Sequence, residues 1–169
     1  MKRNTWVLLL AMVCAPALAD WEGGISFIQL DDDLTGVSPS AVGLSVGHRF
    51  SQEGTTLSLI PTFRIAIGVG DDNVDFAGIP VNIKVNHLWS LSLRGEVDFN
   101  DSVYVWMQTA YTTLDADASA GGFSVSDSDG EFGFGAGIGF DLQEKTSVEL
   151  SFESYDGTDA FVVGVRQRF

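Results

Sequence analysis

A serine–histidine pair is the first arrangement in this sequence that could do chemistry. His87 and Ser90 lie in a segment in which apolar and polar side chains alternate. Side chains three positions apart point to opposite faces of a strand, so these two cannot form the hydrogen bond that a nucleophile needs with its base. His48 has no carboxylate nearby on its own face. We therefore predict no catalytic residue and no enzymatic activity. We interpret both histidines as residues that lie near lipid head groups.

Acidic clusters are the second arrangement with chemical potential. They are Asp31-Asp32-Asp33, Asp71-Asp72 with Asp75, and Asp127-x-Asp129-Gly130-Glu131. Closely spaced carboxylates suit Ca²⁺ or Mg²⁺, but none of these clusters has the ligand spacing of a calcium-binding loop. We predict no metal site and no cofactor, and we interpret the clusters as solvated loops. Loose bridging of divalent cations to lipopolysaccharide phosphates is the alternative.

The N-terminal residues have the pattern of a secretory signal peptide. Lys2 and Arg3 precede an apolar stretch, and Ala17-Leu18-Ala19 is a typical cleavage pattern. The apolar stretch is shorter than the ~20 residues that a membrane-spanning helix needs. We predict a signal peptide over residues 1–19 and a single domain over residues 20–169. Cys14, the only cysteine, lies in the signal, so no disulfide is expected after it.

The charge of the remaining chain is strongly negative. The sequence has 9 Lys+Arg and 23 Asp+Glu, and two of the nine cations are Lys2 and Arg3. The predicted domain therefore has a net charge of −16, from seven cations and 23 anions. Nucleic-acid binding depends on clusters of basic residues, so we exclude nucleic acid as a partner.

Period-2 alternation from Trp21 onward predicts strands. We expect eight of them, over residues 21–30, 41–50, 55–69, 79–99, 103–114, 131–142, 146–155 and 160–169. The alternation keeps its phase from Ile79 to Phe99, which indicates one long strand. Connections after the even-numbered strands are short, and those after the odd-numbered strands are longer or richer in Asp and Gly. This pattern favours an all-β fold, an eight-stranded antiparallel up-and-down transmembrane β-barrel.

A row of glycines separates this prediction from a soluble, lipocalin-like barrel, which also alternates. Gly133, Gly135, Gly137 and Gly139 alternate with large apolar residues. Such a row has no use on a solvated face, whereas inside a narrow barrel it makes room for large neighbours. We expect charged residues to share this interior and to pair there. They are Glu22, Arg49, Arg64, Lys84, Arg94, Glu96, Asp98, Glu149, Glu153 and Arg166.

Aromatic residues near the strand ends predict a girdle at each lipid–water interface. The expected members are Trp21, Phe50, Trp89, Phe99, Phe140 and Phe169. The ten residues from Trp89 to Phe99 span ~25 Å in a tilted strand, about the height of the apolar band. Residues 79–88 would then project from the membrane.

The projecting segment has an apolar stripe formed by Ile79, Val81, Ile83 and Val85. We hypothesise that this stripe binds a partner, with residues 123–126 pairing beside it as a strand. The alternative is that a neighbouring loop simply covers the stripe.

The sequence as a whole resembles the opacity-protein-like, small outer-membrane β-barrel (porin family) proteins of Gram-negative bacteria. The segment from Leu91 to Tyr104 and the closing strand Phe161–Phe169 carry the resemblance most specifically. The resemblance implies a place in the outer membrane, contact with lipid and lipopolysaccharide, and recognition of the last strand by the barrel-assembly machinery. It implies a non-enzymatic role in envelope integrity or in surface interaction and adhesion, with an extracellular protein as a possible partner. A narrow channel for small solutes is the alternative.

Overall fold

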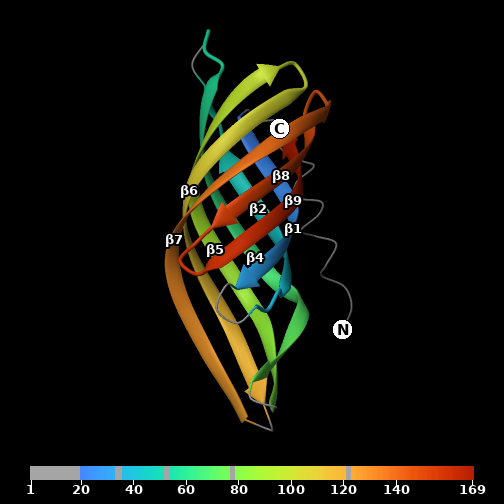
Figure 1. Ribbon diagram of the computed structural model, residues 1–169. Coiled ribbons are helices and arrows are strands. Elements are labelled where there is room, and N and C mark those ends of the chain that lie inside the picture. Colours follow the sequence, from blue (N-terminus) through green and yellow to red (C-terminus); the bar gives the residue numbers. More distant parts are fainter. Residues whose placement is uncertain (1–19, 33–35, 52–53, 77–78, 121–122) are drawn as a thin grey trace, which may run out of the picture.

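The computed structural model describes residues 20–32, 36–51, 54–76, 79–120 and 123–169. The predicted signal peptide, residues 1–19, lies outside the described residues. The described chain is built from antiparallel strands (Figure 1). They are β1 (Trp21–Asp32), β2 (Ser40–His48), β3 (Phe50–Ser51), β4 (Leu57–Phe76), β5 (Ile79–Asn100), β6 (Val103–Ala120), β7 (Phe123–Gln143), β8 (Thr146–Ser154) and β9 (Thr158–Arg168).

The strands form a closed ring. Every strand except β2 pairs with the next strand in the chain, β1 pairs with β9, and β2 pairs with β4 to complete the circle. Only Arg49 separates β2 from β3, which both pair with β4, so the two are parts of one interrupted strand. The described chain therefore runs along the barrel eight times, once for each wall strand. The predicted all-β barrel is confirmed. The C-terminus lies at the end of the ring that has the short turns (Figure 1).

The wall is apolar outside and polar inside. Large apolar side chains of every long strand are exposed; Met107, for example, is 72% exposed and Phe134 is also 72% exposed. Charged and hydroxyl side chains are buried instead, and Arg94, Glu96 and Glu153 are at most 2% exposed. Water would penalise such an apolar exterior, whereas a lipid bilayer would not. Apolar side chains outside and charged side chains inside are therefore stable when the barrel is surrounded by lipid.

Glycines of β7 provide the space that the interior needs. A Cβ on Gly139 would lie 2.0 Å from the Tyr104 ring, and a Cβ on Gly137 would lie 2.5 Å from the Trp106 ring. The glycine row was expected to accommodate charged neighbours, but aromatic rings from β6 fill most of the space. Trp106 faces the interior, where Gly137 leaves room for its ring, and Met107 faces outward.

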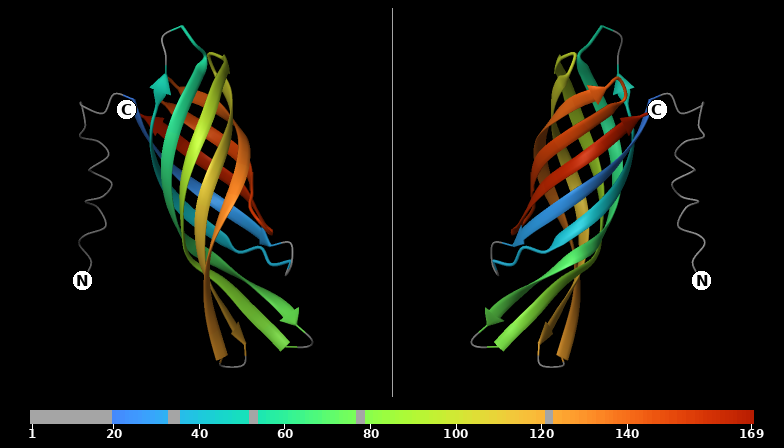
Figure 2. Two further views of the ribbon diagram at one scale, coloured as in Figure 1. Left: turned by 90° about the vertical axis from the view of Figure 1, so that its left-hand side faces the viewer. Right: turned by 90° about the vertical axis from the view of Figure 1, so that its right-hand side faces the viewer.

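Two long hairpins extend beyond the rest of the ring, as both views of Figure 2 show. The β4–β5 pairing continues to Phe76↔Ile79, and the β6–β7 pairing continues to Ala120↔Phe123. Between the hairpins, β5 and β6 stay paired as far as Asn82↔Ser119, which joins all four strands into one sheet. Residues 70–76, 115–120 and 127–130 were predicted to lie in loops, and this prediction was wrong, because all of them lie in strands. Their polar composition hid strands that stand in water on both faces.

The long strand β5 changes its phase in the middle. Its predicted single span, Ile79–Phe99, is confirmed, but the register shifts between Val85 and His87. Beyond this irregularity Val85 is 1% exposed and packs with Leu88 in the apolar cluster, whereas Trp89 and Leu91 face outward. The expectation of an unbroken phase was therefore wrong, because a β-bulge turns side chains to the other face.

We predict that Gly139→Ala destabilises the folded barrel. The new Cβ meets a Tyr104 ring that cannot easily move, since its hydroxyl bonds Ser147 and Glu149. Overpacking of this kind costs about 1–3 kcal/mol. The measurement is the free energy of unfolding in urea, with folded and unfolded protein separated by gel migration. Gly95→Ala is the matched control, because its Cβ would approach only Leu59, at 4.0 Å; equal losses for both variants would contradict the prediction.

Candidate functional site: the ionic network of the lumen

The first part of the lumen network surrounds Glu96 near the short turns. Arg49, Arg94 and Arg166 all donate to its carboxylate, and Arg168 lies 3.6 Å from it. These residues come from β5, β9 and the break between β2 and β3, so they meet only when the ring closes. The irregularity at Arg49 lets one side chain leave the wall and enter the lumen.

Further carboxylates balance these arginines. Glu22 lies 2.7 Å from Arg166 and 3.4 Å from Arg49, and Asp141 lies 3.6 Å from Arg168. A charge buried without a partner is strongly destabilising, whereas a fully paired set is tolerated. The cluster therefore depends on every member.

Glu149 is the centre of the next layer. Arg94 donates to both of its oxygens, at 2.7 and 3.2 Å, and Arg166 donates at 3.0 Å. The Tyr104 hydroxyl donates at 2.6 Å. The guanidinium of Arg94 also lies over the Trp106 ring, 4.2 Å from its centroid, which adds a cation–π contact.

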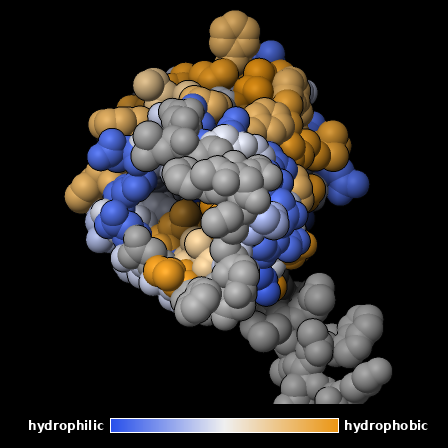
Figure 3. All heavy atoms as spheres, turned by 60° about the horizontal axis from the view of Figure 1, so that its bottom comes forward, coloured by the Kyte–Doolittle hydropathy of each residue, from blue (hydrophilic) through white to orange (hydrophobic). Residues whose placement is uncertain are grey.

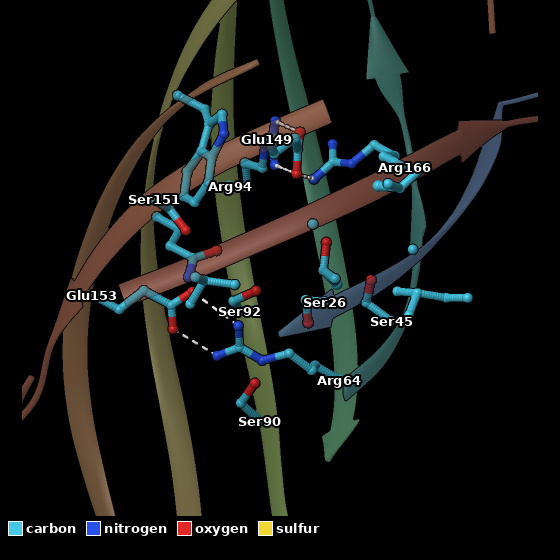
Figure 4. A pocket seen from close by; sticks show the side chains of 18 residues that line it. Ser26, Ser45, Arg64, Ser90, Ser92, Arg94, Glu149, Ser151, Glu153 and Arg166 are labelled. Carbon is cyan, nitrogen blue, oxygen red and sulfur yellow. Dashed lines mark hydrogen bonds and ion pairs between the residues drawn. The ribbon is translucent and has the colours of Figure 1, made fainter. Parts of the chain in front are cut away.

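A third cluster stands apart from the first two. Arg64 of β4 and Glu153 of β8 form two parallel hydrogen bonds of 2.9 and 2.6 Å, and Tyr155 donates to Glu153 at 2.6 Å. Figure 4 shows this pair apart from the Arg94–Glu149–Arg166 layer, with serines around a small cavity that both border. The cavity has a volume of about 60 Å³, enough for a few water molecules. The labelled serines are Ser26, Ser45, Ser90, Ser92 and Ser151.

The structure brings together most of the residues that the sequence placed in the lumen. Arg49, Arg64, Arg94, Glu96, Glu149, Glu153 and Arg166 share these clusters with Glu22. Two assignments were wrong. Lys84 is exposed on the projecting part of β5, because the bulge changes the face of this segment, and Asp98 is exposed beside the short turn.

Sequence reasoning missed three important lumen residues. Arg168 follows Arg166 by two positions and so shares its face, a signal that was available. Tyr104 and Trp106 were not assigned to the lumen, because aromatic residues on a membrane barrel suggest a lipid-facing position. Only the space above the glycines of β7 places them inside.

The predicted girdle residues lie at two levels. Trp21, Phe50, Phe99 and Phe140 are exposed near the short turns, and Phe169 is half-buried there. Near the other end Trp89 contacts Tyr111, and Tyr111 contacts Phe132, with ring centroids 5.9 and 5.0 Å apart. Their role in positioning the barrel in lipid stays a prediction.

The predicted surface stripe is not a uniform exposed row. Val85 is buried, Val81 and Ile83 are half-buried, and the side chain of Ile79 lies outside the described residues. Residues 123–126 form a strand as expected, but they pair with β6, which lies between them and β5. The stripe therefore belongs to a four-stranded sheet.

The histidines and acidic residues offer no further site of catalysis or metal binding among the described residues. His87 is exposed, 3.9 Å from Asp115, while Ser90 is buried in the lumen. Within the described ranges, no three His, Cys, Asp or Glu side chains are grouped so that they could hold a metal ion. No helix in that part of the chain is long and apolar enough to cross a membrane.

One aspartate ties the projecting sheet to the first loop. The backbone N–H of Ser38 donates to Asp72 at 2.8 Å, and the N–H of Asn73 donates to it as well. These donors favour the ionised carboxylate and hold the pKa of Asp72 below its usual range.

We predict that removing one partner of the Arg64–Glu153 pair is far more costly than removing both. Arg64→Met leaves Glu153 buried and unpaired, a loss of about 3–5 kcal/mol. Arg64→Met combined with Glu153→Gln should recover much of this loss. A double-mutant cycle on the free energy of unfolding measures the coupling, with exposed Lys145→Gln as the control. Simple additivity of the two single losses would contradict the pairing.

We predict that the amide resonance of Ser38 titrates with Asp72. Because folding lowers the pKa of Asp72, its hydrogen bond contributes stability above the usual carboxyl pKa of ~3.9, and this is lost as pH falls through the lowered value. An NMR titration should give a midpoint below ~3.9. Asp72→Asn should abolish the titration, whereas Asp101→Asn at the opposite end should not. A midpoint above the usual value would contradict the assignment.

Solved structures share this architecture. The chain is 18% identical to Ail, the attachment invasion locus protein of Yersinia pestis, with a TM-score of 0.58 over 88% of this chain and 96% of that chain. For the neisserial surface protein A the values are 12%, 0.54, 88% and 96%. For the N-terminal β-barrel domain of Pseudomonas aeruginosa OprF they are 11%, 0.53, 89% and 98%. At these identities the likeness shows the fold alone.

The sequence comparisons assign the family. None of the curated proteins is a significant match to this chain. The family model for the outer membrane protein beta-barrel domain, however, matches residues 5–169. The ring of strands with an apolar exterior fits such a domain. The chain belongs to the outer membrane protein beta-barrel domain family.

Proposed function

We propose that this chain is a non-enzymatic protein of the Gram-negative outer membrane, and that its barrel anchors a protein-binding sheet at the cell surface. The observation that carries the proposal is the continuous pairing of β4, β5, β6 and β7 beyond the rest of the ring (Figure 2). Simple loops would suffice to join the strands of a barrel. A rigid sheet of four strands instead presents backbone and side chains in fixed positions.

The sheet has two edges that could accept a strand from a partner. The pairing of β7 with β8 begins only at Phe134, so residues 123–133 have no strand on that side among the described residues. The pairing of β2 with β4 ends at Gly70, so the end of β4 is a second edge. An edge strand recruits another strand through backbone hydrogen bonds, which gives affinity without a deep pocket.

The charge of this region favours a basic partner. Asp71 and Asp117 accept hydrogen bonds from Asn82 and Ser126 respectively, which lowers the pKa of both carboxyls and keeps them ionised. A structure of Ail has been solved in complex with the heparin analogue sucrose octasulfate, which is a polyanion. Electrostatic repulsion argues against such a ligand at the acidic sheet of this chain.

The barrel itself serves as an anchor in this proposal. Its lumen is filled by three layers of ion pairs, so a continuous water-filled path has little room. Export by a cleaved signal peptide over residues 1–19, recognition of β9 by the barrel-assembly machinery, and contact with lipopolysaccharide are parts of the same proposal. The apolar exterior supports them, since such a wall is stable only in lipid.

We predict that excising the projecting sheet removes surface binding and leaves the barrel folded. Asp71–Lys84 and Ala116–Asp127 would each be replaced by an Asn-Gly turn, which suits a two-residue hairpin. Folding is checked by the difference in gel migration between heated and unheated protein. Binding is measured as adhesion of cells that display the protein to immobilised extracellular-matrix proteins.

A second variant and a second measurement make this test specific. Val125 of β7 is 68% exposed, and Val125→Lys keeps the sheet but brings a positive charge to the β7 edge, so adhesion should fall. Glu144→Gln at the opposite end is the control. If the excised barrel adheres as well as the full chain, the surface role is wrong. If it restores the detergent resistance of a strain that lacks the protein, the envelope role belongs to the barrel alone.

We predict no stable conductance across planar bilayers that contain the purified, folded protein. The expected record has no discrete openings above the bilayer baseline, because the arginine–glutamate layers and the Tyr104 and Trp106 rings obstruct the lumen. Discrete, long-lived openings would favour the channel function and would contradict this prediction.

A further inference from the structure

A cavity lies inside the mouth of the barrel, at the end that carries the long hairpins. Its volume is about 230 Å³, and side chains from β1, β5, β6, β7 and the β8–β9 turn line it. Figure 3, which views the molecule with this end turned forward, shows a hollow with hydrophobic residues inside it and hydrophilic residues around part of its rim. The cavity stands above the Arg64–Glu153 cluster, since Tyr155 belongs to both.

The deep part of the cavity is apolar. Leu30 and Leu88 are each 3% exposed and belong to the buried apolar cluster of the barrel, and Leu114 packs against that cluster. Ala116 leaves space beside them. An apolar cavity of this size favours a ligand with an aliphatic group of a few carbon atoms. The lining side chains gain van der Waals contacts when such a group fills the cavity.

The rim of the cavity is acidic. Asp32, Asp129 and Glu131 line it, and Asp156 is close enough to act on Glu131 electrostatically. Glu131 makes no ion pair with any described residue. Neighbouring carboxylates around an apolar floor attract a cation. The protein's own arginines do not meet this need, because all five after residue 19 form ion pairs in the lumen network.

A buried hydroxyl also faces this space. Thr112 lines the cavity and is 6% exposed, and its O–H faces the Tyr155 hydroxyl. A hydroxyl oxygen that faces such an acceptor keeps its lone pairs for a donor. A ligand that carries N–H donors would bond this oxygen.

From these features we propose that the mouth cavity binds a small amphipathic cation, an alkylammonium whose aliphatic part fills the leucine-lined floor and whose ammonium group meets the acidic rim and Thr112. A neutral alcohol would gain the apolar contacts alone, and a carboxylate would be repelled. Asp129 and Glu131 of the rim belong to the part of β7 that also forms a sheet edge, but the cavity is lined by side chains and needs no added strand. The inference does not rest on the proposed surface role.

Hexylammonium is the probe for the test, with hexanol and hexanoate as matched neutral and anionic compounds. The folded barrel is placed in phosphatidylcholine nanodiscs with its leucine methyl groups labelled. We expect hexylammonium to produce saturable shifts of the Leu30, Leu88 and Leu114 methyl resonances. Hexanol should bind at least about fivefold more weakly, which corresponds to one favourable charge interaction, and hexanoate should not saturate.

Three variants locate the binding. Ala116→Phe fills the cavity and should weaken binding more than tenfold, whereas Ala136→Phe, which adds the same ring on the exposed outer face of β7, should leave it unchanged. Glu131→Gln removes one rim charge and should weaken hexylammonium by about fivefold while leaving hexanol unaffected.

Gel migration of heated and unheated samples shows whether each variant is folded. Binding of hexylammonium to the Ala116→Phe variant with unchanged affinity would overturn the site. Equal affinity for hexylammonium and hexanol, or saturable binding of hexanoate, would overturn the requirement for a cation. Because the readout is direct binding to the isolated barrel, its outcome is independent of adhesion: loss of surface binding alone leaves it standing.

Discussion

The pairing of buried charges in a closed lumen is the interaction on which the rest of this structure depends. The carboxylate of Glu96 has almost no contact with solvent and meets the guanidinium groups of Arg94 on its own strand, of Arg49 and of Arg166. In a wall surrounded by lipid these charges have no alternative partner outside. Removing one of them leaves the others in an environment of low polarity, at a cost of several kcal/mol. The network therefore determines which strands face one another across the lumen.

Glycine and aromatic residues make that network possible. The flat, side-chain-free surface of β7 lets Tyr104 and Trp106 enter the lumen, and these rings support Arg94 and hold Glu149 in place. The same rings and ion pairs occupy space that a solute would need. In the proposed function the membrane part is therefore the anchor, and recognition occurs at the end that carries the long hairpins. The two features at the long-hairpin end, the four-stranded sheet and the mouth cavity, are where the structure departs from a minimal barrel.

Alternation and the positions of the turns determined much of this protein from its sequence alone. Where one face is in lipid and the other in a closed lumen, period-2 patterning follows directly from burial. The eight passes of the chain along the barrel and eight of the ten expected lumen charges could therefore be predicted. The acidic composition excluded nucleic acid as a partner. The glycine row also predicted that β7 leaves space inside the barrel for large side chains of its neighbours. These are local signals, and each depends on a single strand.

Only the tertiary structure decided what depends on several strands at once. Burial gives no alternation where both faces of a sheet stand in water, so the sequence of residues 70–76, 115–120 and 127–130 predicts loops, and only their pairing shows them as strands. The bulge near Val85 turns Lys84 out of the lumen, and no periodicity reveals a change of face that only pairing with β6 defines. The mouth cavity likewise arises from five separate segments of the chain. A sequence specifies the face of each residue within a strand, but distances between strands exist only after the ring has closed.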